Sequence, residues 1–177
     1  MSGDRVAATG VGSVTEIRQA QLDDEQALYA LHLATWTSEV SPDGAPDPAA
    51  RFFDDGTDLA DVLVLVEGGQ AIGYVRLVER GPFPSHSHVV GINGLAVAPQ
   101  AQCNGHGRRL IRAALGEAKA RGARKVSLRV LAHNHRARRL YESCGFVVEG
   151  TLRREFLLDG LYVDDLFLAF HLDRDER

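Results

Sequence analysis

The strongest structural signal in this chain is Gln102-Cys103-Asn104-Gly105-His106-Gly107-Arg108-Arg109-Leu110. It connects a hydrophobic run, Ile92 to Val97, with a run of helical character, Leu110 to Ala120. Glycines allow a tight turn that exposes backbone N–H groups. A helix N-terminus adds unpaired N–H donors and the positive end of the helix dipole. This arrangement predicts a pocket that grips a phosphate-bearing ligand.

The spacing of this loop excludes two other phosphate-binding loops. A P-loop needs a Lys and a Ser or Thr after its second glycine, whereas Arg108 and Arg109 follow Gly107 here. A dinucleotide-binding fingerprint needs three spaced glycines, whereas this loop has only Gly105 and Gly107 and lies at mid-chain. From the loop alone, a plain tight turn before a helix stays open as the alternative.

The flanking sequence predicts a mixed α/β sheet with helices on both faces. Apolar residues recur every second position in the expected strands and every 3.6 positions in the expected helices. An Asp-Gly dipeptide predicts the last hairpin turn. Prolines exclude regular helix or central strand over 37–50. Residues Asp23 to Gln26 look like a capping box that opens the first helix. The expected strands are 14–18, 62–67, 71–78, 89–97, 126–130, 147–157 and 162–170, and the expected helices are 23–36, 49–53, 110–120 and 135–143.

The composition describes a single globular domain. The chain has 177 residues, of which 45% are hydrophobic. We expect the domain to cover residues 14–172, between a disordered lead-in over 1–13 and a short polar tail over 173–177. The net charge of −4 argues against nucleic-acid or membrane partners, and no apolar run approaches the ~20 residues of a membrane span. Two cysteines make no disulfide framework, so a cytoplasmic protein is expected.

Two motifs occur in order along the chain. The first is Gln102-x-x-Gly105-x-Gly107, preceded by the strand-like run Leu95 to Pro99. The second is a block that contains Asn134, Ala137, Leu140, Tyr141, Gly145 and Phe146. Together they resemble the GNAT superfamily, the acetyl-coenzyme A-dependent N-acetyltransferases. The resemblance covers about residues 14–172. It implies a largely antiparallel, twisted sheet of about six to seven strands that splays after the strand 89–97.

The resemblance implies how acetyl-coenzyme A (acetyl-CoA) binds. Backbone N–H groups between Cys103 and Arg108 would hold the pyrophosphate, and the Arg108 side chain would add a charged contact. Backbone groups of Leu95 and Val97 would pair with the pantetheine arm as with an added strand, and an N–H near Val97 would face the thioester oxygen. The implied contact residues are Leu95, Ala96, Val97, Gln102, Cys103, Asn104, Gly105, His106, Gly107, Arg108, Asn134 and Arg138.

The helix expected over 135–143 carries the implied catalytic acid. Asn134, Arg138 and Tyr141 are spaced 0, +4 and +7, which predicts that they share one helix face. Sequence alone favours a core role for a helical tyrosine. The resemblance implies instead that Asn134 bonds the pantetheine arm and that Tyr141 protonates the departing thiolate. Neither Cys103 nor Cys144 has a convincing base, so we expect direct attack by the acceptor amine.

The sequence departs from the family at the general base. Many relatives carry a glutamate on the strand before the loop, whereas this chain has Ile92-Asn93-Gly94 there and no acidic residue between Glu79 and Glu117. An amine with a pKa of ~10.4 must nevertheless lose a proton before it can attack. The open candidates are a water positioned by Asn93 and the side chains of His86, His88 and Glu39.

The predicted function is therefore acetyl transfer from acetyl-CoA to a primary amine of a small molecule or a peptide N-terminus. The alternatives are a non-catalytic acyl-CoA-binding regulatory module and a transferase that uses another acyl-CoA. Residues 36–60 are expected to choose the acceptor, which the motifs do not identify. Asp164 and Asp165 either face a cationic acceptor or have structural roles. We expect a monomer or a homodimer.

No metal is expected. His86-x-His88 and His133-x-His135 have the spacing of ligands on a strand, but no third ligand accompanies either pair.

Overall fold

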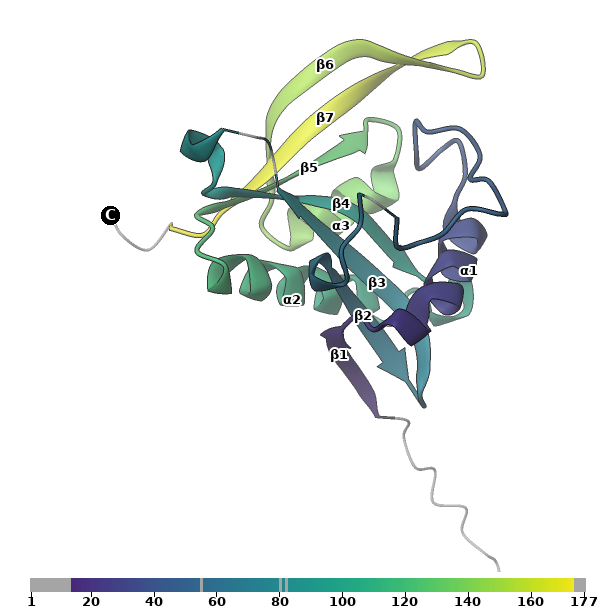
Figure 1. The fold of residues 1–177 in the computed structure, drawn as a ribbon. Helices are drawn as coiled ribbons and strands as arrows, with labels where there is room; N and C mark the ends of the chain where they lie inside the picture. The colour runs from purple at the N-terminus through teal and green to yellow at the C-terminus, as the bar shows by residue number, and fades with distance from the viewer. Residues whose placement is uncertain (1–13, 55, 80, 82, 174–177) are drawn as a thin grey trace, which may run out of the picture.

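The computed structural model describes residues 14–54, 56–79, 81 and 83–173, which form a seven-stranded sheet with three α-helices (Figure 1). The strands are β1 (Thr15–Gln19), β2 (Val62–Glu67), β3 (Gln70–Glu79), β4 (Val89–Val97), β5 (Lys125–Leu131), β6 (Val147–Leu158) and β7 (Leu161–His171). The helices are α1 (Glu25–Thr35), α2 (His106–Ala120) and α3 (His135–Ser143). The predicted lead-in over 1–13 and residues 174–177 of the predicted tail lie outside the described residues.

The sheet order is β1-β2-β3-β4-β5-β7-β6. Within the described residues, β4 and β5 make the one parallel pair, and α2 is the crossover between them. The other neighbours pair antiparallel. The largely antiparallel sheet of six to seven strands is therefore confirmed.

Helices α1 and α2 cover opposite faces of the sheet. Tyr74 of β3 points toward α1, where its hydroxyl lies 3.2 Å from Nδ1 of His32. Its neighbour Gly73 faces α2, because a Cβ at that position would lie 3.1 Å from the Leu110 side chain. Successive residues of a strand point to opposite faces, so the prediction of helices on both faces is confirmed.

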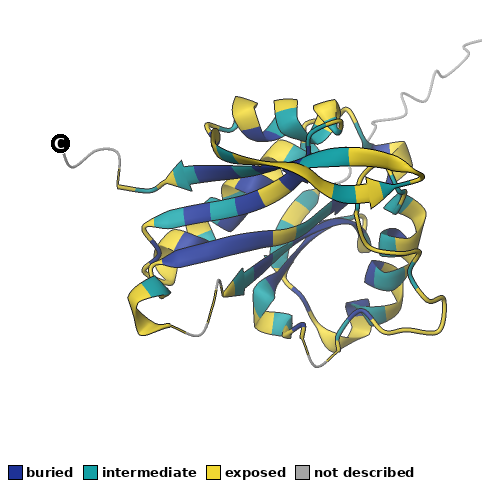
Figure 2. Cartoon of the chain, turned by 90° about the horizontal axis from the view of Figure 1, so that it is seen from above, coloured by how far each residue is buried: buried dark blue, intermediate teal, exposed yellow. Residues whose placement is uncertain are grey.

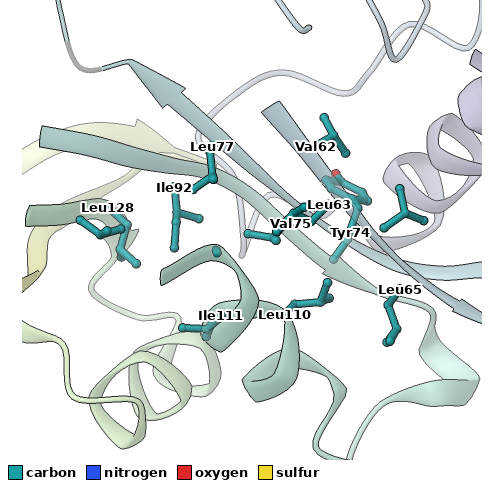
Figure 3. Close-up of a cluster of buried hydrophobic side chains, with 14 of the residues drawn as sticks. Val62, Leu63, Leu65, Tyr74, Val75, Leu77, Ile92, Leu110, Ile111 and Leu128 are labelled. Carbon is teal, nitrogen blue, oxygen red and sulfur yellow. The ribbon is translucent and has the colours of Figure 1, made fainter. Parts of the chain in front are cut away.

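The hydrophobic core fills both faces of the central strands. The residues of β2 from Val62 to Val66 are all buried, as expected for a strand covered on two sides. Figure 3 shows residues of β2, β3 and β4 packed with Leu110 and Ile111 of α2. Burial falls off toward the outer strand β6, most of which is exposed (Figure 2).

Strands β4 and β5 separate half-way along their length. Their register runs from Val89 opposite Lys125 to Ile92 opposite Leu128, and the described residues pair no further. Strand β4 continues to Val97 and β5 to Leu131. The splay implied by the family resemblance is therefore present, and it leaves a gap between the two strand ends.

A β-bulge lies at the point where β4 leaves β5. In the pairing with β3, Leu77 faces Ile92 and Val75 faces Leu95, so two residues of β4 lie opposite the single residue Arg76. These two are Asn93 and Gly94, and Gly94 has φ +135°. Bulges bend a strand and re-aim its backbone groups. Here the bend accompanies the opening of the sheet.

Several helix boundaries differ from the predictions. The helix predicted over 49–53 is wrong, because the N–H groups of Phe52 and Phe53 donate to the Glu25 carboxylate at 2.7 and 3.1 Å instead of closing helical turns. Helix α2 begins at His106 rather than Leu110. The polar residues and the glycine of this first turn have no apolar period, yet Arg109 N–H already donates to Gly105 C=O at 3.1 Å.

The predicted capping box over 23–26 is also wrong. Asp24 is the N-cap of α1, but its carboxylate makes no capping bond to that helix. It accepts from the Gln21 N–H at 2.8 Å and from the Arg18 guanidinium at 2.7 and 2.9 Å. The carboxylate therefore closes a capping box on the preceding 3-10 turn, Leu22–Asp24, whose N-cap is Gln21.

Candidate active site

A cleft of about 1410 Å³ opens where β4 and β5 diverge. The loop between α1 and β2 forms one side of it, and the first turns of α2 and α3 form the other. Asn104 and Arg138 are not among its lining residues. The sequence-predicted residues that line it are Leu95, Ala96, Val97, Gln102, Cys103, Gly105, His106, Gly107, Arg108, Asn134 and Tyr141.

The turn that starts α2 supplies backbone donors at the cleft wall. Cys103 and Gly105 have φ of +66° and +79°, which folds the chain back so that Gly105 is the N-cap of the helix. The N–H groups of the first helical turn, from His106 to Arg108, precede the first i−4 bond and have no intrahelical acceptor. Such a turn has the donor geometry and the dipole that attract an anion.

The two motif glycines have different structural roles. Gly105 takes a left-handed conformation, and a Cβ there would meet no atom within 4 Å. Gly107 does not need a special φ, but a Cβ there would lie 3.0 Å from the Leu140 side chain of α3. Gly107 therefore lets α2 and α3 approach closely, which brings the two motifs to the same cleft.

Gln102 holds the loop against the end of β4. Its side-chain Nε2 donates to the Val97 carbonyl at 2.9 Å. Asn104, which is exposed, points its amide toward the Ala101 carbonyl at 3.5 Å. Both amide side chains are engaged within the fold, so the backbone N–H groups and the Arg108 side chain are the donors of this loop that remain for a ligand.

The gap edge of β4 carries backbone groups without strand partners. Ala98 N–H donates to the Ile72 carbonyl of the β3 side at 2.8 Å. Because backbone groups alternate in direction along a strand, the groups of Leu95 and Val97 point the other way, into the gap beyond the last β5 pairing. Since Val97 C=O is engaged by Gln102, the N–H groups of both residues and the Leu95 C=O remain for an extended ligand.

Helix α3 brings Asn134 and Tyr141 to the cleft. Asn134 is the N-cap, and its Oδ1 accepts the Ala137 N–H at 3.0 Å. Tyr141 packs against Phe146 with 5.8 Å between ring centroids, and burial raises the pKa of its hydroxyl to about 12. The Arg138 guanidinium turns to Glu142 at 2.7 Å instead.

The comparisons with known proteins agree with this geometry. The family model described as "Acetyltransferase (GNAT) family" matches residues 25–146. The chain belongs to the GNAT family. The crystal structure of smu.2055 from Streptococcus mutans UA159 has a TM-score of 0.79 and 32% identity, over 89% of this chain and 99% of that one.

Two curated relatives of this GNAT chain are bacterial. A spermidine N(1)-acetyltransferase from Vibrio cholerae is 36% identical over 110 residues, which are 60% of this chain and 61% of that protein. An uncharacterised N-acetyltransferase, YhfO of Bacillus subtilis, is 35% identical over 85 residues, which are 48% of this chain and 57% of that protein. The chain thus spans about three fifths of the length of these relatives.

The side of the cleft formed by α1 and β3 contains a polar pair that the sequence analysis missed. His32 of α1 and Tyr74 of β3 both line the cleft, and the Tyr74 hydroxyl lies 3.2 Å from His32 Nδ1. Burial lowers the pKa of His32, and the charge of Arg76 lowers it further against the opposing effect of Asp43. Burial also raises the pKa of Tyr74 to about 12. Only tertiary packing brings these residues together, because 41 others separate them in the chain.

The base candidates from the sequence have different positions. Asn93 lines the cleft, and its backbone carbonyl accepts from Arg76 Nε at 2.9 Å. His86, His88 and Glu39 are not among the lining residues. The Glu39 backbone carbonyl lies 2.9 Å from Nε2 of His133.

The two aspartates of the last hairpin have partners within the fold. Asp164 Oδ1 accepts the Arg154 N–H at 2.7 Å, which stabilises the irregular turn of β6 where Arg154 has φ +54°. Asp165 is 2% exposed and forms an ion pair with Arg129. Asp165 lines the cleft, but its charge is already compensated.

In the part of the chain that the structure describes, no group of three His, Cys, Asp or Glu side chains is arranged to hold a metal ion. No helix among the described residues has the length and apolar character needed to cross a membrane.

Proposed function

We propose that this GNAT chain transfers the acetyl group of acetyl-CoA directly to a primary amine of a small molecule or a peptide N-terminus. The observation that carries the proposal is the gap between β4 and β5. Free backbone groups of Leu95 and Val97 face this gap, next to the donor-rich first turn of α2. An extended arm with a phosphate at one end matches this layout.

Each part of the cleft has a role in this proposal. The N–H groups from Cys103 to Arg108 hold the pyrophosphate, and the Arg108 side chain, which lies 3.3 Å from Ser143 Oγ, adds charge. The pantetheine arm pairs with Leu95 and Val97. Acetyl-CoA supplies the activated acyl group. The further contacts we propose are Ala96, Gln102, Asn134 and Arg138, the last by a change of rotamer that releases Glu142.

Tyr141 is the proposed acid. Tyr141 lines the same cleft, and its hydroxyl makes no hydrogen bond to the described residues. The hydroxyl is protonated at neutral pH, since burial raises a pKa that already lies well above 7, so it has a proton to give to the departing thiolate. The N–H of Val97, which points into the gap, is placed to stabilise the negative charge that develops on the thioester oxygen.

The acceptor class is supported by the relatives and by the loop 36–54. The Vibrio relative is named for spermidine, a small polyamine. The loop places side chains of both signs at the cleft, including Asp43, Asp47 and Arg51. This wall suits a small polar acceptor that carries an amine.

The test is release of free thiol from acetyl-CoA in the presence of polyamines, amino acids, aminoglycosides and N-terminal peptides, with the product mass measured for each. Thiol release that depends on one amine, with a gain of one acetyl group, supports the proposal. Tight acetyl-CoA binding without release from any amine would indicate the regulatory module instead. Release with succinyl- or propionyl-CoA alone would indicate another acyl donor.

A further inference from the structure

The acceptor side of the cleft lacks the strand glutamate, yet it contains the His32–Tyr74 pair. Tyr74 is 5% exposed, and within the described residues its hydroxyl bonds only to His32. Phe52 packs edge-on against the Tyr74 ring with 4.8 Å between centroids. A buried hydroxyl held between an aromatic ring and an imidazole has a fixed direction.

Tyr74 also lies beside the part of β4 that faces the gap. It pairs in register with Ala96, between Leu95 and Val97. Its ring borders the bulge, because a Cβ at Gly94 would lie 3.4 Å from Tyr74 Cε2. The tyrosine is therefore the member of the pair nearer to the expected thioester, and His32 lies behind it on α1.

Resting on the proposed function, we propose that Tyr74 and His32 form a proton relay that deprotonates the acceptor amine. Tyr74 Oη takes a proton from the ammonium form of the acceptor while its own proton passes to Nδ1 of His32. The relay performs the task for which relatives use a glutamate. Tyr74 is the catalytic residue, and His32 acts through it.

The groups around His32 keep its imidazole neutral and free to accept a proton. Tyr74 and Arg76 face it from β3, Asp43 faces it from the loop, and the Tyr29 ring lies 6.0 Å away on its own helix. Burial and Arg76 lower the pKa of His32 more than Asp43 raises it. The imidazole is therefore neutral at pH 7, and Nδ1 can accept from the protonated tyrosine.

The protons balance over the reaction. The amine nitrogen that has lost its first proton to the relay forms the N–C bond, and the C–S bond breaks. The second proton that the nitrogen loses replaces, through solvent, the one that Tyr141 gives to sulfur. The proton on His32 leaves to solvent through the open cleft, so one proton is released for each acetyl group transferred.

The first test compares Tyr74→Phe, His32→Asn and the double variant with the wild type over pH 6 to 10.5, using the acceptor that the amine panel identifies. Each single variant should lose about 10²-fold in kcat/KM at pH 7, with the Kd for acetyl-CoA unchanged. The loss should shrink near pH 10, where the amine deprotonates unaided. The double variant should be no worse than the singles, because the two residues act as one unit.

The control is His171→Asn on β7, which removes a histidine that pairs with Glu149 at 2.9 Å, and it should leave the profile unchanged. A loss of equal size at every pH, or additive losses in the double variant, would show a structural role and overturn the relay.

A second measurement needs no acceptor. In imidazole ¹⁵N NMR of the full chain, His32 should become half-protonated at a pH below 6.5, the ordinary histidine pKa. The Tyr74→Phe substitution should shift the Nδ1 signal. A protonated His32 at pH 7, or an unmoved Nδ1 signal, contradicts the relay. If the wild type acetylates no amine, the proposed function fails and the relay fails with it, whereas acetylation by a wild type whose Nδ1 signal does not respond to Tyr74→Phe overturns the relay alone.

Discussion

At the scale of single residues, Tyr141 carries the sharpest prediction. Since burial raises its pKa to about 12, the hydroxyl remains an acid over the whole neutral range. Tyr141→Phe should lower kcat about 10²-fold while the Kd for acetyl-CoA stays the same, as measured by thiol release and by calorimetry. The matched control is Tyr162→Phe, which changes a tyrosine that is 59% exposed on β7. Equal kcat in wild type and Tyr141→Phe would remove this hydroxyl from the mechanism.

Direct attack by the amine makes the two cysteines dispensable. Cys103 is exposed in the phosphate loop and Cys144 is half-buried at the end of α3. Among the described residues, neither sulfur has a hydrogen-bond partner of the kind that activates a thiol, so we expect Cys103→Ala and Cys144→Ala each to keep kcat within about two-fold. The check is steady-state kinetics together with mass spectrometry for an acetylated protein. An acyl-enzyme that forms in the wild type and disappears in one variant would establish the covalent route.

The sequence predicts the residues of contiguous motifs better than those assembled by packing. Tyr141 and the loop 102–108 lie in motifs whose spacing can be read directly. His32 and Tyr74 have no shared motif, because one lies on a helix and the other on a strand that reads as apolar core. Their contact depends on α1 crossing the sheet at β3, which is a tertiary fact. Arg138 shows the converse, since its helical spacing suggests the cleft and its contact with Glu142 turns it aside.

At the scale of elements, substitution of two glycines by alanine should change the stability of the protein in opposite directions. Gly116 is exposed on α2 and a Cβ there would meet no atom within 4 Å, so Gly116→Ala should stabilise the protein by about 1 kcal/mol. Gly73 lies on β3, where a Cβ would lie 2.9 Å from the Ala96 backbone oxygen. Gly73→Ala should destabilise it by about 1–3 kcal/mol. Urea unfolding of the three proteins measures both differences.

The same pair tests the packing of α2 on the sheet. A backbone oxygen cannot rotate away as a side chain can, so the added methyl at Gly73 must move β3 from β4 or from Leu110. Gly73→Ala with wild-type stability would mean that the strands are less closely packed than described. Gly116→Ala that destabilises would place an unseen contact on the exposed face of α2.

The accuracy of a predicted element boundary depends on whether long-range contacts compete with the local sequence pattern. The predictions of strand 89–97 and helix 135–143 match the structure to the residue, since proline and glycine breaks delimit the strand run and Gly145 ends the helix. The helix expected over 49–53 failed because Glu25, distant in sequence, binds its N–H groups. The start of α2 was predicted four residues late, since residues 106–109 have backbone helicity without an apolar period. Long-range hydrogen bonds and polar first turns leave no trace in hydrophobic periodicity.

At the scale of the whole molecule, one ion pair links the edge strand β1 to the start of helix α1. Asp24 is 8% exposed and binds Arg18 of β1 through two hydrogen bonds of 2.7 and 2.9 Å. It also accepts the Gln21 N–H at 2.8 Å, so a single carboxylate joins β1 to the start of α1. Strand β1 pairs with β2 along one edge of the sheet. Loss of this carboxylate should therefore be felt in global unfolding.

The stability of the protein should depend on acid through this carboxylate. The hydrogen bond from Arg18 holds the pKa of Asp24 below its ordinary value of 3.8. A carboxylate whose pKa is lower in the folded state than in the unfolded state stabilises the protein at every pH above its unfolded-state pKa. This stabilisation is lost as the pH falls through the folded-state pKa. We expect the free energy of unfolding of the wild type to be about 2 kcal/mol larger than that of Asp24→Asn at pH 7. This difference should disappear as the pH falls below 3.8.

Urea unfolding at a series of pH values from 7 to 2 measures this difference, with Asp23→Asn as the control. Asp23 is the adjacent exposed carboxylate, so its removal should change stability by less than about 0.5 kcal/mol at any pH. A stability difference for Asp24→Asn that persists unchanged into acid would mean that the substitution removed packing rather than charge.

Because the ion pair ties an edge strand to a helix, the unfolding transitions followed by fluorescence and by circular dichroism should shift together. An early transition of β1 alone would show that this edge unfolds as a separate unit.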